Sequence, residues 1–216
     1  MDKSKIKLQQ VLPKEIEKRS FEIITEELGD VKLDPIQAPV IKRVIHTSAD
    51  FDYVENLYFS GNAVEKMQNA IRNGACIVTD TQMAKSGINK KELAKYGGEV
   101  FCFMSDEDIA EIARKNGTTR ATASMDKAAT LEKELIFAIG NAPTALVRLY
   151  ELVKSCKINP KGIIGVPVGF VNVVEAKELI MELSCPCIVA RGRKGGSNIA
   201  AAICNALLYT LRDEVK

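Results

Sequence analysis

The chain has 216 residues, of which 46% are hydrophobic, and its 30 basic and 28 acidic side chains leave a formal net charge of +2. A chain of this length buries about 70% of the surface that it exposes when unfolded, so it can form a substantial core. The balanced charge argues against a nucleic-acid-binding surface, which needs a local excess of Lys and Arg. We expect one domain over residues 1–216, with an N-terminal arm over residues 1–39.

The beginning of the chain mixes charged side chains with short apolar stretches, unlike a signal peptide or a transit peptide. No apolar run approaches the ~20 residues of a membrane span. We therefore expect a cytoplasmic protein with neither a membrane nor a nucleic acid as partner. The six cysteines lie mostly in apolar segments and are expected to be reduced core thiols. Cys185-Pro186-Cys187 lacks the spacing and the second pair of a zinc site, so we predict no bound metal.

In the arm, the pattern over residues 13–28 predicts a helix that Gly29 ends, and Pro35 and Pro39 favour an extended connection after it. A β-like run then covers residues 40–46 and gives way to polar turn residues. We expect the arm to pack across its own domain or onto a neighbouring molecule.

His46 stands at the end of this β-like run and is the only histidine of the chain. An unperturbed imidazole has a pKa of about 6.5 and can exchange a proton near neutral pH, so His46 is the one candidate for imidazole catalysis. A lone histidine at a strand end is also commonly a structural capping or packing residue. The residues by themselves leave both interpretations open.

Further along the chain, short apolar runs alternate with stretches of helical periodicity, which is typical of repeated βα units. The pattern predicts a flavodoxin-like three-layer sandwich with a mainly parallel five-stranded sheet, its strands within residues 75–79, 100–103, 134–139, 162–166 and 187–190. Helices are expected over residues 52–73, with any interruption near Ser60-Gly61, and over 105–116, 142–154, 172–183 and 198–211. Ser105 and Asp108 predict a capping box for the second of these helices, and Asn116-Gly117 its end.

In an open α/β sheet, ligands bind beyond the carboxyl ends of the strands. The segments that follow four of the predicted strands are rich in glycine and polar groups, namely residues 79–83, 140–143, 167–172 and 191–197. The last segment leads into a helix, so its N–H groups together with Arg191, Arg193 and Lys194 predict an anion site. It matches neither nucleotide-binding glycine pattern, and a flexible turn with solvated charges is the alternative.

Arg120 follows Thr118-Thr119 and is predicted to lie in a loop. A loop arginine can hold a carboxylate through two hydrogen bonds, and an ordinary surface charge is the alternative. Composition and spacing thus indicate an α/β ligand-binding domain without naming a reaction. Two functions are compatible with these features. One is a non-catalytic binding module, and the other is an isomerase of phosphorylated metabolites that uses the loop over residues 191–197.

Five segments, in this order along the chain, resemble the precorrin-8X methylmutase family. They are Arg43-Val-Ile-His-Thr-Ser-Ala-Asp-Phe-Asp52, residues 79–88, Gly140-Asn-Ala-Pro-Thr-Ala-Leu146, Gly165-Val-Pro-Val-Gly-Phe-Val171 and Arg191-Gly-Arg-Lys-Gly-Gly-Ser197, and the likeness spans about residues 10–212. The resemblance implies a flavodoxin-like homodimer with active sites near the subunit boundary. It also implies an isomerase of cobalamin biosynthesis, without a cofactor, that moves a methyl group from C-11 to C-12 of (cobalt-)precorrin-8 to give hydrogenobyrinate or cobyrinate.

The same resemblance assigns roles to four residues. It places the family's catalytic histidine, a proton donor and acceptor, at His46, and the substrate-binding residues at Ser20, Arg43 and Arg120. Two positions depart from the family pattern, because Ala121 replaces a serine and Asn89 stands where relatives carry a threonine. The tetrapyrrole-derived substrate is a large, flat, apolar ring fringed with carboxylates, which suits a pocket with an apolar floor and a rim of Arg, Lys and helix N-termini.

Overall fold

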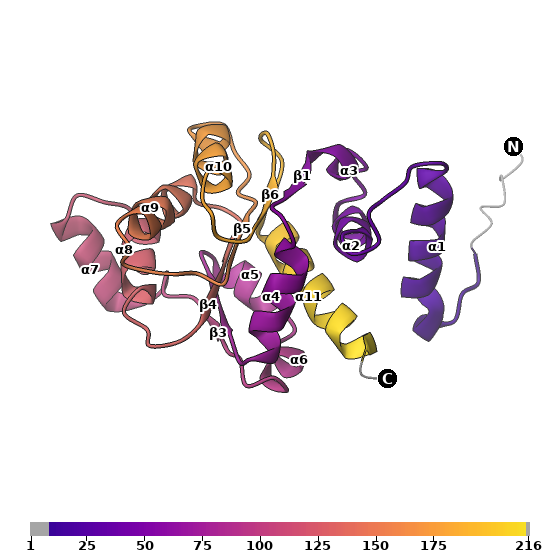
Figure 1. Cartoon of the computed structure of the whole chain (residues 1–216), viewed down its shortest axis with the longest axis horizontal. Coiled ribbons are helices and arrows are strands. Elements are labelled where there is room, and N and C mark those ends of the chain that lie inside the picture. The colour runs from indigo at the N-terminus through magenta and orange to yellow at the C-terminus, as the bar shows by residue number, and fades with distance from the viewer. Residues whose placement is uncertain (1–8, 215–216) are drawn as a thin grey trace, which may run out of the picture. The chain divides into compact units, whose positions relative to one another are not determined.

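The computed structural model describes residues 9–214 and divides the chain into two compact units, residues 1–32 and 33–216 (Figure 1). The first unit contains a short 3-10 helix, Pro13–Glu15, and α1 (Ile16–Leu28). Gly29 follows α1 with φ +56°, and its N–H donates to the carbonyl of Glu26. The helix predicted over residues 13–28 is confirmed, whereas the predicted beginning of the arm, residues 1–8, lies outside the described residues. We predicted the arm over residues 1–39, and the first compact unit covers residues 1–32 of that range.

The second unit is built around a six-stranded sheet in the order β1-β6-β5-β4-β2-β3 (Figure 1). Strands β2 to β6 are parallel to one another, and β1 pairs with β6 in the antiparallel sense. Numbered along the chain, the parallel strands lie in the flavodoxin-like order 2-1-3-4-5. The predicted fold is confirmed with one extra strand; the strands are β1 (Leu57–Phe59), β2 (Cys76–Thr79), β3 (Val100–Phe101), β4 (Leu135–Ile139), β5 (Gly162–Gly165) and β6 (Cys187–Ala190).

The extra strand, β1, lies inside the segment that we predicted as helical over residues 52–73, next to the interruption that we placed near Ser60-Gly61. That helix is instead divided into α3 (Tyr53–Asn56) and α4 (Ala63–Arg72), with β1 between them. Tyr58 pairs with Val189 of β6, which would otherwise be the edge of the sheet. An open edge leaves backbone groups unpaired, so covering β6 with a short strand outweighs the helical pattern of this segment.

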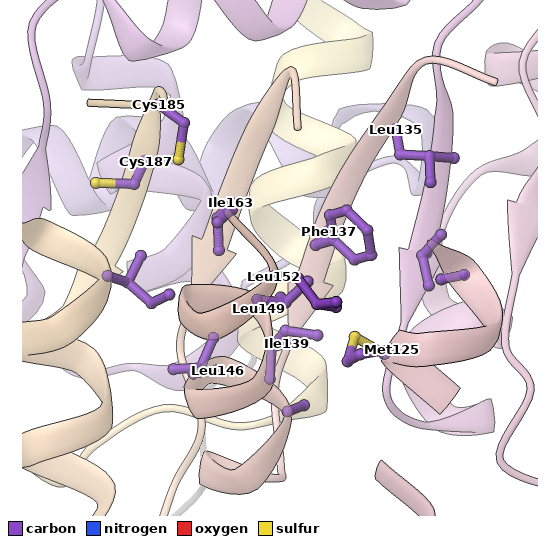
Figure 2. Packing of buried hydrophobic residues seen from close by; sticks show 14 of the residues in the cluster. Met125, Leu135, Phe137, Ile139, Leu146, Leu149, Leu152, Ile163, Cys185 and Cys187 are labelled. Atoms are coloured by element: carbon purple, nitrogen blue, oxygen red, sulfur yellow. The ribbon is translucent and has the colours of Figure 1, made fainter. Parts of the chain in front are cut away.

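Helices cover both faces of the sheet (Figure 1). One face carries α8 (Arg120–Ala128), α9 (Pro143–Lys154) and α10 (Val173–Met181), and the other carries α4, α5 (Gln82–Gly87) and α11 (Ser197–Glu214). Figure 2 shows the core of the first face, where Phe137 and Ile163 from the strands meet Met125 of α8 and Leu146 and Leu149 of α9. Successive strand residues point to opposite faces, so each fully buried strand serves both layers. The three-layer sandwich is therefore confirmed.

Residues 40–46, predicted as β-like, belong to a helix, α2 (Ala38–Ser48). Pro39 lies in its first turn, and its buried residues, Val40, Ile41, Val44 and Ile45, recur with helical spacing. They form the face that packs beside α11. The prediction was wrong because β-branched side chains favour strands only weakly, and burial of one face of a helix overrides that preference.

The helices predicted over residues 142–154, 172–183 and 198–211 are confirmed as α9, α10 and α11. The helix expected over residues 105–116 is α7 (Glu107–Lys115), followed by Gly117 with φ +62°, but its predicted capping box is wrong. Asp106 is the N-cap without a side-chain bond, and Ser105 instead contacts Gln82, its Oγ 3.3 Å from the amide Nε2. The short helices α5 and α6 (Lys90–Ala94) were not predicted.

Two sequence-based expectations concern the chain as a whole. All six cysteines are free, and only Cys156 among them is exposed, so their prediction as unpaired and mostly buried thiols is confirmed. Over residues 9–214, no helix is both long and apolar enough to cross a membrane.

Candidate active site

His46 and Arg43 lie one turn apart on α2 and therefore share a side of that helix. Val44 and Ile45 are buried between them, which fixes the rotation of the helix about its axis. His46 itself is exposed. A histidine that packs in the interior would be buried, so its exposure argues against a packing role for His46, while its place in the last turn of α2 is compatible with capping that helix.

The guanidinium of Arg43 lies over an aromatic ring of α11. Its Cζ is 4.9 Å from the ring centroid of Tyr209, and the Cζ of Arg212 is 4.8 Å from the same centroid. Asn89 Nδ2 donates to the Tyr209 hydroxyl at 3.3 Å, while its Oδ1 accepts from the N–H of Glu92 and caps α6. Cation–π contact orients Arg43, and Asn89, which departs from the family pattern, helps to hold the ring that does so.

The turn after α2 is tied to the glycine-rich loop that precedes α11. Lys194 Nζ lies 2.7 Å from Asp50 Oδ2 and 2.5 Å from Asp52 Oδ2. The Lys194 ammonium lowers the pKa of the Asp50 carboxyl, and the two carboxylates raise the pKa of Lys194. Since Arg43 contacts the far end of α11 and Asp50 contacts the residues before it, α2 and α11 run antiparallel.

A buried lysine shapes this loop from inside. Lys177 of α10 has no exposed surface, and its Nζ donates to the carbonyls of Gly192 at 2.8 Å and Lys194 at 2.9 Å. Burial lowers the pKa of Lys177 to about 8. Arg193 lies between Gly192 and Lys194 in the chain, and its carbonyl accepts from the N–H of Gly169 at 3.2 Å.

Three successive carbonyls of the loop therefore point inward. Because the C=O and N–H of a trans peptide point in opposite directions, the N–H groups of Arg193, Lys194 and Gly195 point away from Lys177. Within residues 9–214 these three N–H groups have no acceptor. A Cβ on Gly195 would lie 2.1 Å from the Val166 carbonyl oxygen, so only glycine fits this turn. The conformation suits the anion site predicted for residues 191–197.

Exposed apolar side chains lie beside this loop, in the segment between β5 and α10. Phe170 is 82% exposed and Val171 79% exposed, and the Cζ of Arg193 lies 5.6 Å from the Phe170 ring centroid. Arg191 lies over the ring of Tyr58 at 5.0 Å. We predicted residues 167–172 as a polar, glycine-rich loop and missed this surface, although Val168, Phe170 and Val171 around Gly169 were a visible signal.

Asp80 fills the crevice between β2 and β4, where the strand order reverses and flavodoxin-like folds commonly bind phosphate groups. Its buried carboxylate accepts from the N–H groups of Gly140, Asn141 and Ala142 at 2.9, 2.8 and 2.6 Å. Burial raises the pKa of Asp80, and the three N–H donors oppose that rise. A Cβ on Gly140 would lie 2.6 Å from Ser197 Cα, so the chain closes this crevice by itself. A phosphate group therefore does not fit in this crevice between β2 and β4.

Replacing Asp80 with Asn tests this internal anchor. We expect Asp80→Asn to lower the free energy of unfolding by about 2–4 kcal/mol, because one amide oxygen cannot satisfy three buried N–H donors. The matched surface change is Asp126→Asn, which removes a half-exposed partner of Arg148 at 2.8 Å and is expected to cost less than about 1 kcal/mol. Urea unfolding measures both, and equal losses would show that Asp80 is no anchor.

Arg120 is the first residue of α8 and is exposed. The predicted loop is wrong here because Thr119 Oγ1 accepts from the N–H of Thr122 at 3.1 Å and starts the helix at Arg120. Within the second unit, α8 and α2 lie on opposite sides of the sheet (Figure 1). The structure thus brings Arg43 and His46 together, but it does not bring Arg120 of the same chain to them.

Ser20 belongs to the first unit, where it lies in the middle of α1. Its Oγ donates to the carbonyl of Ile16 at 2.9 Å, one turn earlier in the helix. The side chain is half-buried. A serine hydroxyl that donates in this way keeps its oxygen lone pairs available to accept a hydrogen bond.

A model of the family described as precorrin-8X methylmutase matches residues 15–210 of the chain. The chain belongs to this family. It is 47% identical to the cobalt-precorrin-8 methylmutase of Salmonella typhimurium, over 93% of the chain and 97% of that protein. It is 46% identical to the protein of the same name from Priestia megaterium, over 91% of the chain and 88% of that protein.

A solved structure of a precorrin-8X methylmutase, from Thermus thermophilus, has the same fold as this member of the family. The two superpose with a TM-score of 0.84 and 38% sequence identity, over 93% of this chain and 98% of the other. Precorrin-8X methylmutases are isomerases of cobalamin biosynthesis, so the chain is an enzyme and not a non-catalytic binding module.

Proposed function

We propose that the chain moves a methyl group from C-11 to C-12 of (cobalt-)precorrin-8 and so forms hydrogenobyrinate or cobyrinate. The observation that carries this proposal is the exposed His46 on the same helical side as Arg43, within one of the five segments that resemble the family. The names of the relatives support the substrate. Substrate and product of an isomerisation have the same atoms and oxidation level, so the reaction needs no redox cofactor.

In this proposal, His46 assists the migration as a proton donor. The methyl shift is pictured as a [1,5]-sigmatropic rearrangement of the conjugated ring. A proton or strong hydrogen bond given to a ring nitrogen withdraws electron density and lowers the barrier to migration. The imidazole regains its proton when the product forms, so the enzyme ends the cycle unchanged.

The other groups are proposed to bind the ring and its acid side arms. Arg43 and the outward N–H groups of residues 193–195 suit carboxylates, which accept charge-assisted hydrogen bonds. Phe170 and Val171 offer exposed apolar surface for the flat ring. Ser20 is proposed as a further substrate contact, because its hydroxyl can accept from the substrate.

We also propose that the enzyme is a cytoplasmic homodimer and that Arg120 completes the site of the partner subunit. This proposal is supported by the exposure of Arg120 on the layer of helices opposite α2, away from the His46 of its own chain. In a two-fold symmetric dimer the same contact occurs twice, which gives two equal sites.

Titration with the coloured products tests substrate recognition. We expect hydrogenobyrinate, cobyrinate or both to show a shifted visible spectrum on binding. Arg43→Ala should weaken this binding by about 1–3 kcal/mol through loss of charge-assisted hydrogen bonds. Lys161→Ala is the control, since Lys161 pairs with Glu134 at 2.9 Å between the amino ends of β4 and β5. Absence of a shift with both compounds would contradict the proposed substrate class, and a comparison of the two shows which ring the protein prefers.

A further inference from the structure

We infer that Lys177 is a positioning residue for the reaction, acting on His46 through the glycine-rich loop. A lysine without exposed surface is costly to bury, because its ammonium loses its hydration. The two carbonyls that accept from its Nζ, those of Gly192 and Lys194, lie in the same turn. The buried charge therefore holds one short segment of backbone and no other part of the chain that the structure describes.

The loop segment that Lys177 holds, residues 192–194, is in turn connected to α2 by ion pairs. Lys194, whose carbonyl Lys177 holds, extends its own ammonium to Asp50 and Asp52 at 2.7 and 2.5 Å. The N–H of Asp50 in turn donates to Ser48 Oγ at 3.2 Å, at the last residue of α2. The chain of contacts thus runs from the interior of α10 to the helical turn that carries His46.

This connection is specific in its geometry. The sequence offers apolar residues in plenty for the interior of α10, such as Ile180 one turn later, which is fully buried as well. An apolar side chain at position 177 would fill the space but would leave two inward carbonyls without a donor. Without these two hydrogen bonds, the loop would no longer hold its carbonyls inward. Lys194 would then no longer be fixed opposite Asp50 and Asp52.

The single histidine makes the inference testable by a direct signal. In tag-free protein labelled at histidine, every side-chain histidine resonance comes from the imidazole of His46, and the ring Cε1–H resonance is followed. We expect Lys177→Met to shift or broaden this resonance, to lower kcat about 10- to 100-fold as a misplaced catalytic group does, and to raise KM, because the same loop carries the N–H groups proposed to bind the substrate. Lys194→Met breaks the exposed half of the connection without touching the core, so it tests the inference even if Lys177→Met does not fold.

Ile180→Ala is the matched control, because it destabilises the same helix without touching the loop. It should lower the melting temperature yet leave the His46 resonance and kcat in place. An unchanged resonance in both lysine variants, or an equal change in Ile180→Ala, would overturn the inference. The inference rests on the proposed role of His46, and the two fail differently. Full activity of His46→Ala would refute the role of His46, whereas shifted resonances with full activity in the lysine variants, or unmoved resonances in both, would refute the role of Lys177.

Discussion

His46→Ala is expected to lower kcat by about 10²–10⁴-fold, the usual contribution of a general acid, while product binding stays nearly unchanged. The carboxylate-binding groups proposed here lie on other residues, so the variant should still shift the visible spectrum of the product. Single-turnover conversion of precorrin-8, followed by absorbance, measures the chemical step. Since the chain has one histidine, no second imidazole can replace the lost one.

Two comparisons separate chemistry from folding in this variant. His46 is exposed, so its truncation should leave the unfolding temperature within a degree or two of the wild type. His46→Gln keeps a hydrogen-bond donor but cannot transfer a proton. Its activity therefore shows how much of the rate depends on hydrogen bonding and how much on proton transfer. Undiminished methyl migration in His46→Ala would end the assignment of His46 as the proton donor.

The sheet was predictable because its strands are buried on both faces. Runs such as Leu135–Ile139 are continuously apolar, and their intervals are long enough to hold crossover helices, which is enough to predict a parallel α/β fold. The same logic failed for α2 and β1. Val40 and Ile41 favour strands by local preference, and Leu57 and Tyr58 continued a helical pattern, but contacts with α11 and β6 decided both cases.

The candidate site was predictable only in part, for a related reason. His46 stands out because it is unique, and Arg43 by its place in the motif that resembles the family. Tyr209, which orients Arg43, lies 166 residues along the chain, and Lys177 looks like an ordinary charge in a helical pattern. Their roles depend on which elements the fold packs together, and no local pattern encodes that. Arg120 was predicted as a contact, but its place in the helix layer opposite α2 was not.

Mixing two inactive variants tests whether Arg120 acts across the subunit boundary. We expect His46→Ala and Arg120→Glu dimers each to be nearly inactive, the second because a carboxylate repels the acid side arms of the substrate. In a mixed dimer, one site carries both changes and the other carries neither. Random exchange makes half of the dimers mixed, so activity should return to about a quarter of the wild-type value.

The pair His46→Ala and Arg43→Glu supplies the control. Both changes lie on α2, one turn apart, so every site of their mixed dimer carries one of them and no activity should return. Exchange by co-expression followed by separation of differently tagged dimers gives the mixed species directly. Recovery in the first mixture but not in the second requires Arg120 and His46 to meet from different chains. If neither mixture recovers although mixed dimers form, Arg120 serves its own chain or none, and the shared site is excluded.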